Sequence, residues 1–146
     1  MTGAGSLRKT VLVVDDNEPT RALIGRILSQ ELDVDVQLAG SGAEAERLAE
    51  QHRYDVILLD LLMPGTSGFD VLQWLRTRSG LNRATPVIVV SVLGDEQSVQ
   101  RCNALGATFH VVKPIMRESL ARVVAEHLYP GAAGDAPGTA ASPTAG

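Results

Sequence analysis

Apolar and polar residues alternate along this chain with two different periods. Short β-branched runs recur at five places and predict β-strands. These runs are Thr10–Val14, Val34–Leu38, Val56–Leu59, Val87–Val90 and Thr108–Val112. Three of them are apolar nearly throughout, which is typical of parallel strands covered on both faces. The run at 34–38 alternates with polar residues and is therefore expected at an edge of the sheet.

A segment with helical spacing follows each of these runs. The apolar positions of the five predicted helices are Leu23, Ile24, Ile27 and Leu28; Ala45, Leu48 and Ala49; Phe69, Leu72 and Leu75; Val99, Cys102 and Leu105; and Leu120, Val123, Val124 and Leu128. Pro19 suits a first turn, Ser41 with Glu44 has capping-box spacing, and Asp95 suits an N-cap. This alternation predicts an α/β fold, a doubly wound (βα)5 sandwich around a parallel sheet.

The 146 residues fit one domain with short extensions. We expect a flexible leader at residues 1–8 and a folded domain at residues 9–129. Residues 130–146 are rich in Ala, Gly, Pro, Thr and Ser. Such a stretch buries too little apolar area to offset its ordering entropy, so we expect a disordered tail or linker there.

Composition excludes several classes of partner. The net charge is −4 and no basic stripe is present, so direct nucleic-acid binding is not expected. The only cysteine, Cys102, cannot form an internal disulfide, which favours a cytoplasmic location. No apolar run approaches the roughly 18 residues of a membrane span, so no membrane contact is expected.

Polar residues stand at the ends of four of the five predicted strands. Asp15 and Asp16 follow the first strand, Asp60 the third, Ser91 the fourth and Lys113 the fifth. Ligands of open parallel sheets bind at this edge. Each residue alone is commonly a cap or loop residue, but five together predict a site. Three carboxylates in one crevice repel one another, and Mg²⁺ would relieve the repulsion. With an ammonium and a hydroxyl added, the site suits phosphoryl transfer.

Five segments in this order resemble the response-regulator receiver family of two-component signalling. They are Val11–Glu18, Tyr54–Gly65 with Gly68, Pro86–Ser91, Gly106–Ala107 and Val111–Pro114, and the resemblance covers about residues 8–128. It implies a receiver domain at 9–129 with a flavodoxin-like sheet of strand order 2-1-3-4-5. It also implies a phosphoprotein switch rather than an enzyme with turnover, promoting its own aspartyl phosphorylation and dephosphorylation.

The resemblance assigns roles to the acidic residues. Asp60 would accept the phosphoryl group from the phosphohistidine of a histidine kinase or histidine phosphotransfer protein. Asp16, Asp60 and the backbone carbonyl of Leu62 would bind Mg²⁺ directly, and Asp15 would bind it through water.

The resemblance also implies how the signal is read. Lys113 would contact a phosphate oxygen, in a cis peptide bond with Pro114, and Ser91 would move toward the phosphoryl group. His110 stands where the family usually has Tyr or Phe, so it is either the second switch residue or an ordinary strand histidine. The family further implies a possible homodimer through the fourth helix, fifth strand and fifth helix.

Other departures from the family pattern concern access to the site. Val92 stands where the family usually has Ala or Gly, and its larger side chain would narrow the approach of a phosphodonor. Leu62 and Leu93 occupy positions that tune dephosphorylation, and two apolar side chains there would hinder the attacking water.

Three other functions are compatible with part of this pattern. A haloacid-dehalogenase-like phosphatase would need its nucleophile in a D-x-D motif after the first strand, where this chain has adjacent acids. A flavodoxin-like electron carrier would need a Ser, Thr and Gly-rich first loop to hold phosphate. A phosphorylation-independent, receiver-like interaction scaffold is the alternative that remains open.

Overall fold

Five strands and five helices alternate along residues 8–130, the part of the chain that the computed structural model describes. They are β1 Lys9–Val14, α2 Glu18–Glu31, β2 Val34–Ala39, α3 Gly42–Gln51, β3 Val56–Leu59, α4 Gly68–Thr77, β4 Val87–Ser91, α5 Glu96–Ala104, β5 Phe109–Val112 and α6 Arg117–Leu128. Most of the expected leader (1–7) and tail (131–146) lies outside the described residues.

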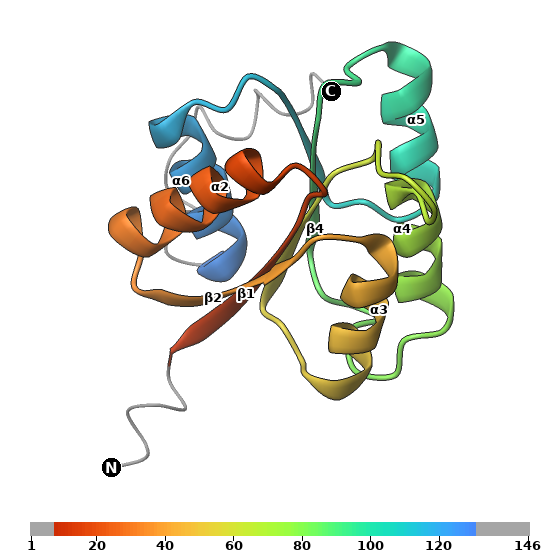
Figure 1. The fold of residues 1–146 in the computed structure, drawn as a ribbon, viewed down its shortest axis with the longest axis horizontal. Helices are drawn as coiled ribbons and strands as arrows, with labels where there is room; N and C mark the ends of the chain where they lie inside the picture. The colour runs from red at the N-terminus through yellow and green to blue at the C-terminus, as the bar shows by residue number, and fades with distance from the viewer. Residues whose placement is uncertain (1–7, 131–146) are drawn as a thin grey trace.

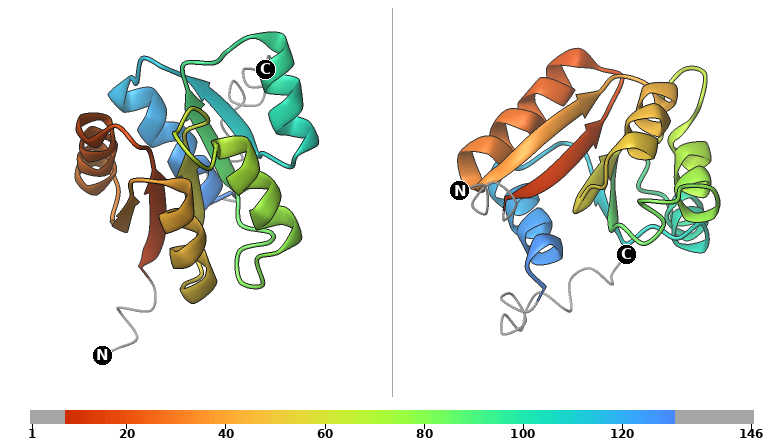
Figure 2. Two further views of the ribbon diagram at one scale, coloured as in Figure 1. Left: turned by 45° about the vertical axis from the view of Figure 1, so that its right-hand side comes forward. Right: turned by 90° about the horizontal axis from the view of Figure 1, so that it is seen from below.

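The strands form one parallel sheet in the order β2-β1-β3-β4-β5. The predicted order and the doubly wound architecture are therefore confirmed. Helices α2 and α6 cover one face of the sheet, and α3, α4 and α5 cover the other (Figure 1, Figure 2). The alternating strand β2 lies at an edge, as its half-polar pattern predicted.

The central strands have apolar side chains on both faces, and every residue of β3 is buried. On one face the core joins strand residues such as Val11 and Val13 to Ile24 of α2 and Leu120 of α6. On the other face a separate core joins the sheet to α3 and α4. Burying one such side chain stabilises the fold by about 1.5–3 kcal/mol. The two cores hold the strands in place, and so they position the polar residues at the carboxyl ends of the strands.

The prediction for the first helix was wrong at Leu23, which is 40% exposed. Helix α2 instead turns Gly25 toward β2, together with its buried neighbour Ile24. A Cβ on Gly25 would lie 3.3 Å from Cδ2 of Leu38 and 3.7 Å from Cγ1 of Val36. The glycine therefore allows a close approach of helix and strand that an apolar pattern alone does not reveal.

Helix caps place the loops that follow the strands. Asn17 begins α2 by accepting a hydrogen bond from the Thr20 N–H at 2.9 Å, so the helix starts directly after the two acids of the first strand. The predicted caps Ser41 and Asp95 are confirmed, since each side chain accepts a bond from the N–H three residues later. The Lys113–Pro114 peptide bond is cis, as the resemblance implied.

Candidate functional site

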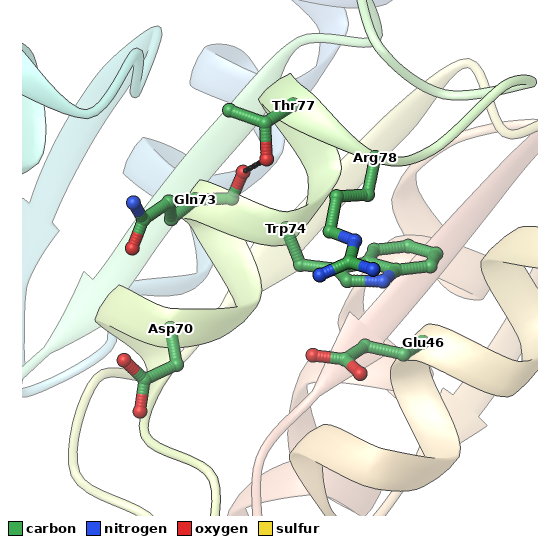
Figure 3. A pocket seen from close by; sticks show the side chains of 6 residues that line it. All are labelled: Glu46, Asp70, Gln73, Trp74, Thr77 and Arg78. Carbon is green, nitrogen blue, oxygen red and sulfur yellow. Dashed lines mark hydrogen bonds between the residues drawn. The ribbon is translucent and has the colours of Figure 1, made fainter.

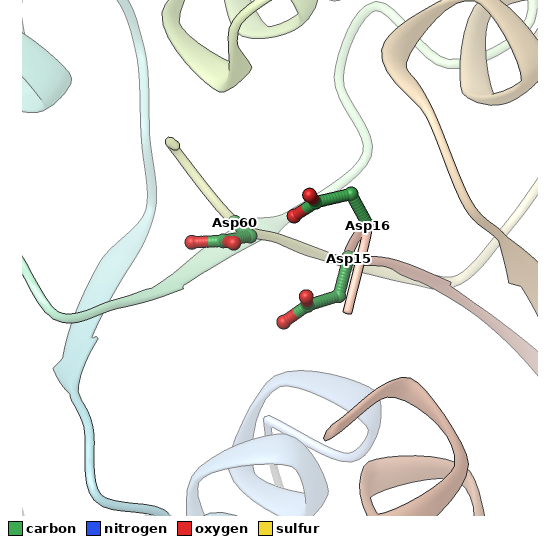
Figure 4. Close-up of side chains that lie close together, drawn as sticks. All are labelled: Asp15, Asp16 and Asp60. Carbon is green, nitrogen blue, oxygen red and sulfur yellow. The ribbon is translucent and has the colours of Figure 1, made fainter. Parts of the chain in front are cut away.

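Three aspartates meet at the carboxyl ends of β1 and β3. Val14 pairs with Leu59 in the sheet register, so the residues that follow these strands leave the sheet side by side. One carboxylate oxygen from each of Asp15, Asp16 and Asp60 lies within 4.8 Å of the others. Figure 4 shows the three side chains around a common space. Asp15 and Asp60 are buried, whereas Asp16 is exposed and leaves the cluster open to solvent.

Lys113, which follows β5, brings the nearest positive charge. Its Nζ lies 3.0 Å from Oδ2 of Asp15 and 3.7 Å from Oδ2 of Asp60. Within residues 8–130, no other basic side chain forms an ion pair with the three acids. One ammonium faces three carboxylates, so the cluster retains net negative charge. A set of hard oxygen donors with excess negative charge fits Mg²⁺.

Burial is the main influence on the Asp60 carboxyl group. It raises the pKa of Asp60 above its ordinary value, because the ionised form loses hydration. The charge of Lys113 lowers this pKa and the nearby Asp15 raises it, while the backbone N–H groups of Leu62 and Leu61 lower it further. The ionised form of Asp60 would therefore gain from additional positive charge.

The loop between β1 and α2 is held by hydrogen bonds between side chains and the backbone. The Asn17 N–H donates to Oδ1 of Asp15 at 2.9 Å, which leaves Oδ2 to Lys113. The Arg21 Nη1 donates to the Asp15 backbone carbonyl at 2.8 Å, and its guanidinium lies against Gly40. Arg21 is a supporting residue that the sequence analysis missed, because nothing in its spacing separates it from a solvent-exposed helix arginine.

The loop after β3 requires a glycine at the start of α4. A Cβ on Gly68 would overlap the backbone carbonyl of Asp60 and lie 2.6 Å from Cα of Leu61. The Gly68 N–H also donates to the Leu61 carbonyl at 2.9 Å. Helix α4 therefore supports the backbone of Asp60 directly.

The two predicted switch residues contact one residue of the loop after β4. Ser91 is fully buried, and its Oγ accepts a hydrogen bond from the Leu93 N–H at 3.2 Å. On the other side, Nε2 of His110 lies 2.7 Å from the Leu93 carbonyl oxygen. The His110 Nδ1 is buried and has no hydrogen-bond partner in the described part of the chain. The backbone of Leu93 thus joins Ser91 to His110, a connection that no sequence signal predicted.

Two residues that depart from the pattern of the resembled family have exposed side chains. Leu62 is 51% exposed and Val92 is 59% exposed. Phe109 packs into the α2 and α6 core, on the sheet face opposite to His110, because successive side chains of a strand point to opposite faces.

A separate hollow of about 360 Å³ lies between α3 and α4. Figure 3 shows Glu46 extending from α3 toward Asp70 and Trp74 of α4 and toward Arg78, the residue that follows this helix. Burial, followed by the charges of Asp70 and Glu50, raises the pKa of Glu46. This hollow shares no residue with the aspartate cluster. Among the described helices, none combines the length and apolar character needed to cross a bilayer.

Comparison with known proteins agrees with this geometry. A family profile described as "Response regulator receiver domain" matches residues 11–125. The transcriptional regulatory protein ResD of Bacillus subtilis is 36% identical over 116 residues, which are 79% of this chain and 46% of that protein. The chain therefore spans less than half the length of this relative.

Solved structures are similar over most of this chain. The chemotaxis protein CheY4 of Vibrio cholerae has a TM-score of 0.77 and 30% identity, over 83% of this chain and 99% of that one. The receiver domain of sensor histidine kinase PA1611 from Pseudomonas aeruginosa has a TM-score of 0.75 and 26% identity, over 83% and 98%. That structure holds a magnesium ion coordinated in its active-site cleft.

Proposed function

Because this chain belongs to the family of response regulator receiver domains, we propose that Asp60 is the phosphoacceptor of its two-component signalling switch. The observation that carries this assignment is the cluster of three carboxylates with a single ammonium. Asp60 is the buried acid that follows the third strand. The Nζ of Lys113 lies 3.7 Å from Oδ2 of Asp60, which is farther than its 3.0 Å distance to Oδ2 of Asp15. That spacing leaves an oxygen of Asp60 free to act as a nucleophile.

The transfer would move one phosphoryl group between two side chains. A carboxylate oxygen of Asp60 attacks phosphorus, a P–O bond forms, and the P–N bond of the donor phosphohistidine breaks. The leaving imidazole keeps the bonding electron pair and takes a proton from solvent. Lys113 would move from Asp60 to bind an oxygen of the transferred phosphoryl group. Its ammonium would then neutralise part of the negative charge of that group.

Magnesium is the cofactor that the donor set fits. Asp16, Asp60 and the backbone carbonyl of Leu62 would bind the ion directly, and Asp15 would contact it through water. When bound, Mg²⁺ supplies positive charge that offsets the repulsion between the attacking carboxylate and the phosphoryl oxygens. The magnesium in the cleft of the similar PA1611 receiver supports this assignment.

Ser91 and His110 would carry the change to the surface. The Ser91 hydroxyl would turn from the Leu93 N–H to donate to the phosphoryl group. Moving Leu93 then alters the His110 contact with its carbonyl. Since a phosphorylated Asp60 would bind Ser91 better in one loop arrangement, phosphorylation would shift the population toward that arrangement.

The switch would return to its resting state by hydrolysis of the acyl phosphate at its own site. Leu62 and Leu93 occupy the positions that tune dephosphorylation in the family, and apolar side chains there would hinder the attacking water, so we expect slow dephosphorylation. A decay assay on the phosphorylated protein tests this. Leu62→Asn and Leu93→Glu should each speed the loss of phosphate, and unchanged, rapid loss in both variants would contradict it.

Histidine kinases or histidine phosphotransfer proteins are the partners of receiver domains, and we propose one of them as the phosphodonor here, in the cytoplasm.

A homodimer would form through α5, β5 and α6, where Val112 is 47% exposed and Met116 is 62% exposed. We expect no direct contact with nucleic acid or with a membrane. Sedimentation with and without phosphodonor tests the dimer.

The proposed phosphorylation has a direct test. The protein is incubated with Mg²⁺ and a small-molecule phosphodonor, and its intact mass is measured. Wild type should gain the mass of one phosphoryl group, while Asp60→Asn and wild type with EDTA should gain none. Asp70→Asn, which changes an aspartate outside the cluster, is the matched control and should be phosphorylated normally. A mass gain in Asp60→Asn would overturn the assignment. No gain in folded wild type would favour the phosphorylation-independent scaffold.

A further inference from the structure

A groove of about 610 Å³ lies between the loop that follows Asp60, the start of α4, and α5. Its wall includes Leu61, Leu62 and Met63 from the loop, and Phe69 from α4. None of the clustered aspartates lines it, and neither does Lys113. The groove therefore adjoins the proposed phosphorylation site and shares Leu62 with it, since the Leu62 backbone carbonyl is a proposed magnesium ligand, but the groove contains none of the charged residues of that site.

The surface of this groove is largely apolar. Leu62 is 51% exposed, and Phe69 is only partly buried against the small core around Leu61. Met63 is 8% exposed and also lines the groove. Apolar side chains that lie next to one another in a groove with a polar rim offer a surface that another molecule can cover.

One cation stands over this apolar surface. The guanidinium carbon of Arg101, from α5, lies 3.9 Å from the centre of the Phe69 ring. In residues 8–130, no carboxylate forms an ion pair with Arg101, and its side-chain N–H groups donate no hydrogen bond. Stacking on the ring restricts the side chain before any ligand arrives. A restricted guanidinium with free donors is suited to bind a carboxylate.

The groove also contains one acidic side chain, which would orient a bound ligand. Asp70 lies in the first turn of α4 and lines the same groove. A ligand carboxylate would be repelled from Asp70 and drawn to Arg101. Its apolar part would then lie over Leu62 and Met63.

We propose that this groove docks a peptide segment of a partner protein in which an acidic residue stands beside large apolar residues. The charge and the apolar surface together define this chemistry. Leu62 and Arg101 are both exposed, so the groove is open to solvent along its rim. An open groove would leave a small molecule half-solvated, whereas a chain segment adds backbone contacts along its length.

Amide-resolved NMR titration of the full, unphosphorylated chain without Mg²⁺ tests this. The probe is the capped tripeptide N-acetyl-Leu-Phe-Asp-amide, and its Asn counterpart and phenylacetate are the comparison ligands. We expect saturable shifts of amides in residues 61–69 and at Arg101. The Asn counterpart should bind about tenfold more weakly, since a hydrogen bond between charged groups is lost.

Variants separate the groove from its surroundings. Arg101→Gln should weaken binding of the Asp peptide about tenfold and leave binding of the Asn peptide unchanged. Asp70→Asn should strengthen binding of the Asp peptide. Arg78→Gln, in the hollow between α3 and α4, is the matched control and should bind as wild type does.

Three results would overturn the proposal: no saturable shifts with the Asp peptide, equal binding by Arg101→Gln, or phenylacetate binding as tightly as the peptide. Because the titration uses neither phosphodonor nor metal, its outcome does not depend on the role of Asp60.

Discussion

Replacing Asp60 with Asn should stabilise this protein when no divalent cation is present. The substitution removes one negative charge from a cluster in which carboxylate oxygens of three aspartates lie within 4.8 Å of one another. Asn has nearly the same size and can still accept a hydrogen bond, so packing around the side chain is preserved. The dominant change is therefore electrostatic.

The size of the effect follows from the distances. Two unit charges 4.8 Å apart repel by roughly 3.5 kcal/mol at an effective dielectric constant near 20, and Asp60 faces two such charges. Lys113, at 3.7 Å, attracts Asp60 by roughly 4.5 kcal/mol on the same scale. Solvent screens the exposed Asp16 more strongly, while burial adds a cost of ionisation. We expect a net gain in the free energy of unfolding of about 1–3 kcal/mol.

Urea unfolding of wild type and Asp60→Asn, in EDTA and in Mg²⁺, measures this. Magnesium at a concentration of about 100 times its dissociation constant should stabilise wild type by about 2.7 kcal/mol and Asp60→Asn by much less. The difference in the free energy of unfolding between Asp60→Asn and wild type should then narrow or change sign. Glu50→Gln, an exposed acid on α3, is the control and should change by less than about 0.5 kcal/mol. Destabilisation of Asp60→Asn in EDTA, or equal stabilisation of both proteins by Mg²⁺, would refute the electrostatic reasoning.

Three further predictions concern packing and hydrogen bonds within the fold. Burial raises the pKa of Cys102 to about 11, so alkylation near pH 8 should be slow until urea exposes the thiol, and rapid stoichiometric labelling of the native protein would argue against this burial. The same pKa shift means that the folded state loses stability as the pH rises above the ordinary thiol pKa of 9.0. Gly68→Ala should lower the free energy of unfolding by about 2 kcal/mol or more, because its Cβ meets the Asp60 and Leu61 backbone, whereas Gly80→Ala, with no atom within 4 Å, should change little in the same urea titration. Asn82→Ala should cost about 2–4 kcal/mol, because the buried Asn82 side chain bonds the carbonyls of Ala49 and His52 and the N–H of Tyr54, and a loss below about 0.5 kcal/mol would show that water replaces these bonds.

The sequence was most informative where one period dominates. Continuous apolar runs identified the buried strands, and the polar alternation in β2 identified an edge. The exposed Leu23 could not be foreseen, because Gly25 does not count as apolar and yet lies on the packed face of α2. Strand order was implied by the family resemblance, since periodicity alone does not determine which parallel strands pair.

The site was predictable as a set of residues but not as a set of contacts. Strand ends placed the three acids and Lys113 at one edge before any coordinates were known. Nothing in the sequence indicated that the ammonium lies closer to Asp15 than to Asp60. The contacts of Ser91 and His110 with Leu93 depend on backbone groups, which residue types do not encode. The stacking of Arg101 on Phe69 joins two different helices, α5 and α4, so the residue spacing within one helix could not predict it.

The measurement that most directly tests the central claim is chemical mapping of the phosphorylated residue. The protein is phosphorylated in Mg²⁺, reduced with borohydride, which converts an aspartyl phosphate to homoserine, and digested for peptide sequencing by mass spectrometry. We predict homoserine at position 60 and unmodified aspartate at positions 15 and 16. Homoserine at position 15 or 16, with Asp60 intact, would contradict the assignment of the nucleophile and of the switch built around it.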